Sequence, residues 1–93
     1  MTPEHERLLS LVAPLRAIGW VFLPTTLAAP TNRRVVDALF GMRTHDDIED
    51  NLQMWEQWAT ASRLRKSRGH ETQLWHSSGR TPRIVKEILD LPE

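Results

Sequence analysis

The spacing of apolar residues near the N-terminus predicts an amphipathic helix. Thr2 followed by Pro3 is typical of a helix start, because the hydroxyl can cap the first turn and proline is tolerated at the first helical position. Pro14 lies inside the repeat and predicts a kink or a break, and Gly19 predicts the end of the helix. The positions expected to share its buried side are Leu8, Leu11, Val12, Leu15 and Ile18.

Two further helices are predicted after a short aromatic and β-branched strand over residues 20–23. The first runs over residues 32–40, from a cap at Thr31 to a stop at Gly41. The next runs over residues 44–59, because Thr44 and Asp47 have the spacing of a capping box. Its expected buried face, at positions i, i+4, i+7 and i+11, consists of Ile48, Leu52, Trp55 and Ala59.

From residue 62 the apolar pattern changes from helical spacing to alternation, which predicts a β-hairpin. Residues 62–68 alternate, Gly69 and His70 form the expected turn, and residues 71–76 are extended again. Thr81 and Pro82 then predict a last helix that ends near Leu89.

The order of these elements resembles the winged helix-turn-helix superfamily. Residues 31–78 carry the resemblance: two short helices are followed by an Arg-rich strand, a tight turn at Gly69 and a strand that ends in Leu74 and Trp75. The resemblance implies an α+β fold class, a small winged helix-turn-helix with three core helices plus a β-hairpin wing and a C-terminal helix, as one domain over residues 1–93. It also implies that the protein binds DNA, with the third helix in the major groove.

Composition is that of an ordinary globular protein, with 40% hydrophobic and 26% charged residues. The chain has no cysteine, which excludes disulfides and thiolate metal sites. Its apolar stretches are too short to span a membrane and its N-terminus lacks the basic start of a signal peptide, so we expect a cytoplasmic protein without a membrane partner. The excess of arginine over lysine indicates a GC-rich coding sequence and hence a bacterial or phage source.

Charge is segregated along the chain although the net charge is zero. Residues 44–59 carry five acidic side chains and no Lys or Arg, whereas residues 60–86 carry seven basic side chains and one acidic one. Such blocks create local fields that a partner can recognise.

The leading hypothesis is a small DNA-binding transcriptional regulator that contacts duplex DNA through the basic wing and flanking arginines. Arginine suits phosphates and the minor groove, while Asn51 and Gln53 can bond to base edges. A charged edge strand that resists aggregation is the competing interpretation of the wing. A homodimer built with the C-terminal helix would strengthen DNA binding. The predicted DNA-binding residues are Arg33, Arg34, Asn51, Gln53, Arg63, Arg65, Lys66, Arg68, Arg80 and Arg83.

The acidic block departs from the resemblance, because four carboxylates at the start of the predicted third helix oppose docking on phosphates. Acids there complement a helix dipole, but four of them suggest a surface for a basic partner. The alternative function is therefore a winged-helix protein–protein interaction module, a phage or bacterial adaptor or inhibitor. It would bind a basic protein through Asp46, Asp47, Glu49, Asp50 and Trp58.

The sequence contains no recognisable catalytic or metal-binding constellation. No general base is placed in register with a nucleophile, and the histidines lack metal-ligand spacing. We expect no enzymatic activity, no metal and no cofactor.

Overall fold

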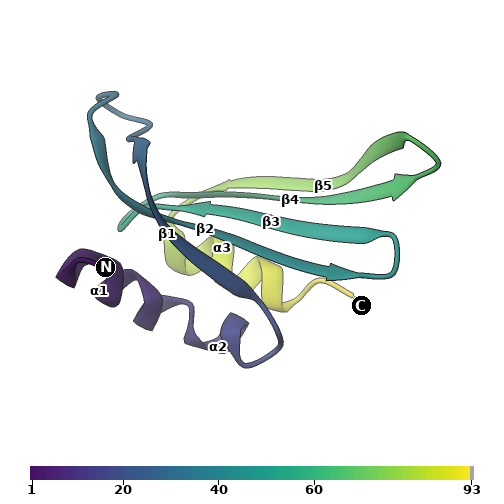
Figure 1. The fold of residues 1–93 in the computed structure, drawn as a ribbon, viewed down its shortest axis with the longest axis horizontal. Coiled ribbons are helices and arrows are strands. Elements are labelled where there is room, and N and C mark those ends of the chain that lie inside the picture. The colour runs from purple at the N-terminus through teal and green to yellow at the C-terminus, as the bar shows by residue number, and fades with distance from the viewer. Residues whose placement is uncertain (93) are drawn as a thin grey trace.

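The computed structural model describes residues 1–92 and is mostly β. Its five strands form one antiparallel sheet in the order β1-β2-β3-β4-β5, so each strand pairs with its neighbours in the sequence (Figure 1). Two helices precede the sheet and one follows it. The elements are α1 (Pro3–Leu11), α2 (Ala13–Arg16), β1 (Val21–Ala28), β2 (Val35–His45), β3 (Ile48–Met54), β4 (Ala59–Ser67), β5 (His70–Gly79) and α3 (Thr81–Leu89).

This sheet contradicts the predicted winged helix-turn-helix fold and its α+β class with three core helices. The segments expected to be the second and third helices form β2 and β3 instead. Ile48 and Leu52 are four residues apart, a spacing that fits a helix and a strand equally well. Asp50 and Met54 are buried on the same side as Leu52, which is the period of two of a strand. Pairing with strands on both sides overrides the helical interpretation.

Several local predictions are confirmed. Thr2 caps α1 by accepting a hydrogen bond from the backbone N–H of His5, and the helix breaks at Val12, just before Pro14. The predicted strand over residues 20–23 is the start of β1, and the hairpin after residue 62 is β4–β5. Its turn is formed by Arg68 and Gly69, both with positive φ as a two-residue hairpin turn requires, one residue earlier than the expected Gly69 and His70.

The helices cover one face of the sheet and leave the other open (Figure 1). Trp20 and Phe22 stack at the edge of the covered face, with ring centroids 5.9 Å apart. The core of that face joins strand residues Leu39, Leu52, Met54, Ala59 and Ala61 to helix residues Leu8, Leu15, Ile84, Val85 and Ile88 and to Val12. None of the helices within residues 1–92 is long and apolar enough to cross a membrane.

We call the uncovered side the open face. The tip of the β1–β2 hairpin rises on this side, away from the helices (Figure 1). By strand register the open face consists of Val21, Leu23, Thr25 and Leu27 of β1, Val36, Ala38, Phe40, Met42 and Thr44 of β2, Glu49, Asn51 and Gln53 of β3, Thr60, Ser62, Leu64 and Lys66 of β4, and Glu71, Gln73, His76 and Ser78 of β5.

Candidate functional site

A buried ion pair joins the acidic and basic blocks of the sequence across β3 and β4. Arg63 donates from Nε and Nη2 to the two carboxylate oxygens of Asp50, at 2.7 and 3.0 Å. His45 Nε2 lies 3.8 Å from the same carboxylate, and Arg63 also donates to the carbonyl of Pro92. Arg63, one of the predicted DNA contacts, is thus held inside the fold.

Two more cations of the predicted wing have carboxylate partners. Lys66 donates to Glu49 at 3.1 Å, and Arg65 Nε lies 3.5 Å from Asp47 Oδ2. Asp46 occupies the β2–β3 turn with φ of 54°, so the four acids line one hairpin rather than a helix. The acidic block is therefore matched by the basic block of the same chain.

The other predicted DNA contacts are spread over the molecule. Arg33 and Arg34 lie in the β1–β2 loop and Arg68 in the β4–β5 turn, at opposite ends of the sheet (Figure 1). Within residues 1–92 none of these three has a carboxylate partner.

The remaining predicted contacts lie on both sides of the sheet. Arg80 precedes α3, and Arg83 in α3 bonds to Glu87 at 2.8 Å and to the Ser78 carbonyl at 2.6 Å. Asn51 and Gln53 lie on the open face. No surface of the described chain brings the whole predicted set together.

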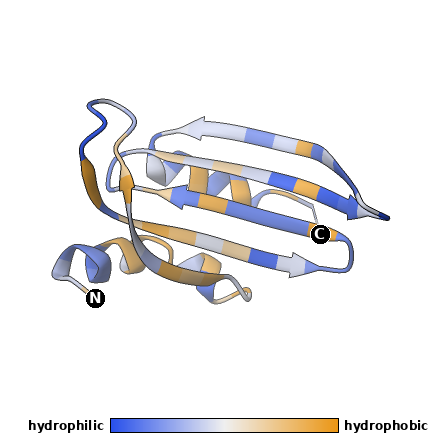
Figure 2. Ribbon diagram, turned by 45° about the horizontal axis from the view of Figure 1, so that its top comes forward, coloured by the Kyte–Doolittle hydropathy of each residue, from blue (hydrophilic) through white to orange (hydrophobic). Residues whose placement is uncertain are grey.

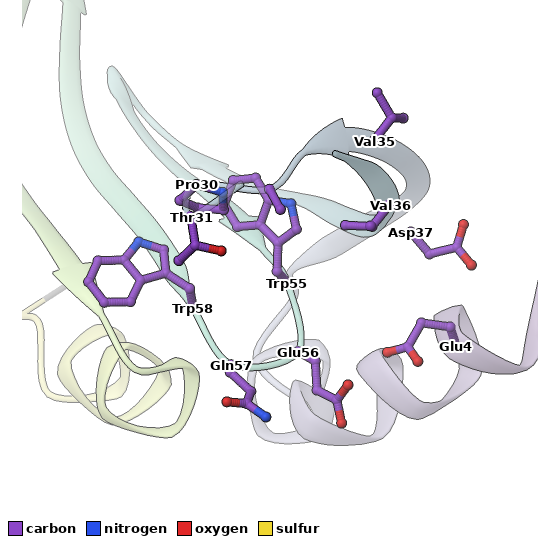
Figure 3. A pocket seen from close by; sticks show the side chains of 11 residues that line it. Glu4, Pro30, Thr31, Val35, Val36, Asp37, Trp55, Glu56, Gln57 and Trp58 are labelled. Carbon is purple, nitrogen blue, oxygen red and sulfur yellow. The ribbon is translucent and has the colours of Figure 1, made fainter. Parts of the chain in front are cut away.

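A crevice of about 780 Å³ lies at one end of the sheet, between the β1–β2 loop, the β3–β4 loop and α1 (Figure 3). In Figure 3 Trp58 lies at one end, Trp55 lies in the middle, and the carboxylates of Glu4 and Asp37 lie at the other end, toward α1. We call this feature the tryptophan crevice. It is lined by Glu4, Ala29, Pro30, Thr31, Val35, Val36, Asp37, Trp55, Glu56, Gln57 and Trp58.

The β3–β4 loop that carries both tryptophans is fixed by two hydrogen bonds. The backbone N–H of Trp55 donates to the carbonyl of Trp58 at 2.8 Å and closes the loop. The hydroxyl of Thr81, fully buried at the start of α3, donates to the Trp55 carbonyl at 3.0 Å. The loop is therefore anchored to α3, and the indole of Trp58 remains 40% exposed.

The first turn of α1 fixes the opposite wall of the crevice. Thr2 Oγ1 donates to Asp37 of β2 at 2.7 Å, and His5 Nε2 lies 2.9 Å from the carbonyl of Thr25 in β1. His5 Nε2 is also 3.7 Å from Asp37 Oδ1. These contacts hold α1 against the β1–β2 hairpin, so the walls of the crevice belong to one framework.

Three carboxylates and one guanidinium set the electrostatics where α1 meets the β3–β4 loop. Arg7 bonds to Glu4 and, at 3.1 Å, to Glu56. The hydrogen bond to Glu4, together with the charges of Glu4 and Glu56, raises the pKa of Arg7 above its ordinary value. The carboxylate of Asp37 brings the acidic groups to three, so the crevice keeps an excess of negative charge.

Trp55 has an unsatisfied donor. Its Nε1 is shielded from solvent and has no hydrogen-bond partner among residues 1–92. Such a group costs free energy until an acceptor reaches it.

Sequence reasoning found one residue of this site and missed the others. Trp58 was placed in the protein-binding set, but together with four acids that lie at the other end of β3. Trp55 was assigned to a helical core face, and Glu4, Asp37 and Glu56 were assigned to no site. The available signal was the pair of tryptophans three residues apart around Glu56 and Gln57, which fits a loop between two strands.

The chain was compared with known protein families, curated proteins and solved structures, and none of them matches it. Within residues 1–92, no group of three or more His, Asp or Glu side chains is arranged to hold a metal ion.

Proposed function

We propose that this chain is a protein-interaction module that binds a basic segment of a partner protein in the tryptophan crevice. The observation that carries the proposal is the placement of two tryptophans beside three carboxylates around one open crevice. Tryptophan is the best aromatic partner for a guanidinium or ammonium group, and carboxylates bind the same cations through charge-assisted hydrogen bonds. The combination selects for Arg or Lys on an extended segment.

The charges around the crevice affect a basic ligand and DNA in different ways. Arg7 offsets one of the three carboxylates, and a cation from a partner can compete with it for Glu56, whose side chain is half exposed. Arg33 and Arg34 lie on the adjoining β1–β2 loop but do not line the crevice. A basic ligand is repelled by these two residues, whereas DNA is attracted to them.

A DNA-binding regulator, the leading hypothesis from the sequence, has less support. Arg63, Arg65 and Lys66 are paired with carboxylates of β3 and of the β2–β3 turn. Arg33, Arg34 and Arg68, which have no such partner within residues 1–92, lie at opposite ends of the sheet instead of along one stripe (Figure 1). Phosphate binding depends on clustered cations, so this arrangement favours a protein ligand.

The proposal can be tested with a fluorescently labelled oligo-arginine peptide and a matched peptide in which citrulline replaces arginine. We expect anisotropy to report binding of the arginine peptide only. Trp58→Ala should weaken that binding by about tenfold, the value of a cation–π contact of roughly 1–2 kcal/mol. Glu56→Gln should weaken it as well, because it removes a carboxylate from the rim. The matched control is Glu71→Gln, which removes an exposed carboxylate of β5 outside the crevice.

The double variant Arg33→Ala and Arg34→Ala separates the two functions. We expect it to tighten binding of the arginine peptide, and the same change would weaken binding of a labelled duplex if DNA were the ligand. If the arginine peptide does not bind at low salt, or binds Trp58→Ala as tightly as the unmodified protein, the proposal is rejected.

A further inference from the structure

The open face carries apolar side chains that the helices do not cover. Val21 and Leu23 of β1 are 62% and 59% exposed, and Val36 and Met42 of β2 are each 38% exposed. Phe40, between Val36 and Met42 on the same face, is half-buried. Figure 2 shows hydrophobic residues concentrated on β1 and β2, and more hydrophilic ones along β4 and β5.

The apolar β1–β2 half of the open face has no ionisable side chain. The ionisable residues of this face are Glu49, Lys66, Glu71 and His76, all on β3–β5, and Glu49 accepts hydrogen bonds from Asn51 at 2.9 Å and from Lys66 at 3.1 Å. Interface centres are depleted in charged residues in the same way. The uncharged β1–β2 half therefore does not repel its equivalent on a second copy.

We infer that the open face is the interface between two copies of this chain, stacked as a two-fold β-sandwich with β1 over β1 of the second copy. A two-fold axis that lies between the sheets and runs across the strands places each strand over its own equivalent. The apolar β1–β2 halves then meet each other, and the mostly polar side chains of β3–β5 meet their equivalents. An axis parallel to the strands would instead place β1 over β5 and bury apolar groups against polar ones.

The size of the face matches what a stable dimer needs. Five strands about 4.8 Å apart, with about eight residues each, cover roughly 24 by 26 Å, or about 600 Å² of plane before side-chain relief is added. A standard interface buries about 800 Å² of accessible surface on each partner. Two twisted sheets stack in this way with their strands about 30° apart.

The other surfaces that could join two copies are less suitable. The apolar side of α3, which was expected to form a dimer, packs into the core through Ile84, Val85 and Ile88. The free edge of β1 contains Pro24, which has no N–H to donate to another strand. In contrast, the open face has a hollow of about 350 Å³ beside Phe40 and Met42 that can receive side chains of a second copy.

The dimer leaves the proposed peptide site largely accessible, since Val36 is the one residue that belongs to both the open face and the tryptophan crevice. The two proposals therefore succeed or fail separately.

The inference is tested by the mass of the full chain in solution, measured by sedimentation over a wide range of concentrations. We expect a dimer. Leu23→Lys and Leu23→Glu should each give a folded monomer, because Leu23 is exposed within one copy and the two substituted β1 strands would face each other with like charges. An equimolar mixture of the two variants should restore the dimer, because opposite charges then meet.

The matched control is Leu89→Lys, which places the same charge at a similarly exposed leucine on the helical side. We expect this variant to remain a dimer. Circular dichroism checks that every variant keeps its sheet. A monomer at all concentrations of the unmodified protein, or a dimer that persists unchanged in Leu23→Lys, would overturn the inference.

Discussion

Asp50 is 2% exposed, and its carboxylate is the centre of the buried ion pair on the helical side of the sheet. Arg63, whose side chain is 11% exposed, binds both of its oxygens. Removal of one partner of such a pair leaves the other charge buried without compensation. We therefore expect Asp50→Ala to lower the free energy of unfolding by about 3–5 kcal/mol, measured by urea denaturation.

A half-exposed pair in the same hairpin provides the comparison. Asp47 and Arg65 are separated by 3.5 Å and both side chains are about half exposed, so solvent screens their attraction. Asp47→Ala should cost less than about 1 kcal/mol. Equal costs for the two substitutions would contradict a role for the buried pair in stability.

Glu49 provides a test of how the stability of the protein depends on pH. The hydrogen bond from Asn51, followed by that from Lys66, lowers the pKa of Glu49 below its ordinary value of 4.5. The unfolded chain then binds a proton at a higher pH than the folded protein does, so stability rises with pH in this range. The contribution of Glu49 is present above pH 4.5 and is lost as the pH falls through the folded pKa below that value.

We expect Glu49→Gln to remove this part of the acid destabilisation. The difference in unfolding free energy between Glu49→Gln and the unmodified protein should be constant above about pH 5 and shrink below pH 4.5. Urea denaturation at a series of pH values measures it, with Glu71→Gln as the control on β5. If the stability curves of Glu49→Gln and the unmodified protein are parallel from neutral to acid pH, the contribution of Glu49 to the pH dependence of stability is refuted.

At the scale of the elements, Gly41 decides how β1 and β2 pack. It pairs with Phe22 across the two strands, and a Cβ on Gly41 would lie 2.8 Å from Cδ1 of that ring. The ring is held by its stacking on Trp20 and by the core. Gly41→Ala should therefore destabilise the protein by about 1–3 kcal/mol, as overpacking does.

Gly79, at the end of β5, provides a comparison for Gly41. A Cβ there would also meet a side chain, but that side chain is the guanidinium of Arg83, the end of a flexible and mostly exposed residue. Arg83 can move away at the loss of its bond to the Ser78 carbonyl, about 1 kcal/mol. Thermal unfolding should rank Gly41→Ala as the less stable variant, and the reverse order would contradict the packing assigned to Phe22.

At the scale of the whole molecule, the inferred dimer makes stability depend on concentration. A partner that binds only the folded chain raises the unfolding temperature as its concentration increases. We expect the midpoint of thermal unfolding to rise with protein concentration for the unmodified chain and to be constant for Leu23→Lys. A constant midpoint for both proteins would count against the dimer.

Some local signals in the sequence predicted local structure, whereas the helix stop at Gly41 and the capping box of Thr44 and Asp47 were wrong, because these residues lie in β2 and the β2–β3 turn. Thr2 and Pro3 predicted the start of α1, Pro14 its break, Gly69 the β4–β5 turn, and Thr81 with Pro82 the start of α3. Each of these signals acts through backbone geometry or hydrogen bonds within a few residues. They needed no knowledge of the rest of the fold.

The candidate site was predicted only in part, because its members are distant in the sequence. Trp58 was recognised as an interface residue, but Glu4 and Asp37 reach the crevice from α1 and β2. No spacing rule joins residue 4 to residues 37 and 56. Only the packing of α1 against the sheet places them around one crevice.

The sequence by itself determined the capped first helix, the hairpin turn at Gly69, the last helix and the segregation of charge. The tertiary structure decided whether residues 35–45 and 48–54 are strands, since Ile48 and Leu52 fit either period and strand partners settle the choice. It also decided what the charged blocks do. In the sequence the acidic and basic blocks resemble surfaces for two different partners. In the structure β3 and β4 are adjacent and antiparallel, so the two blocks neutralise each other.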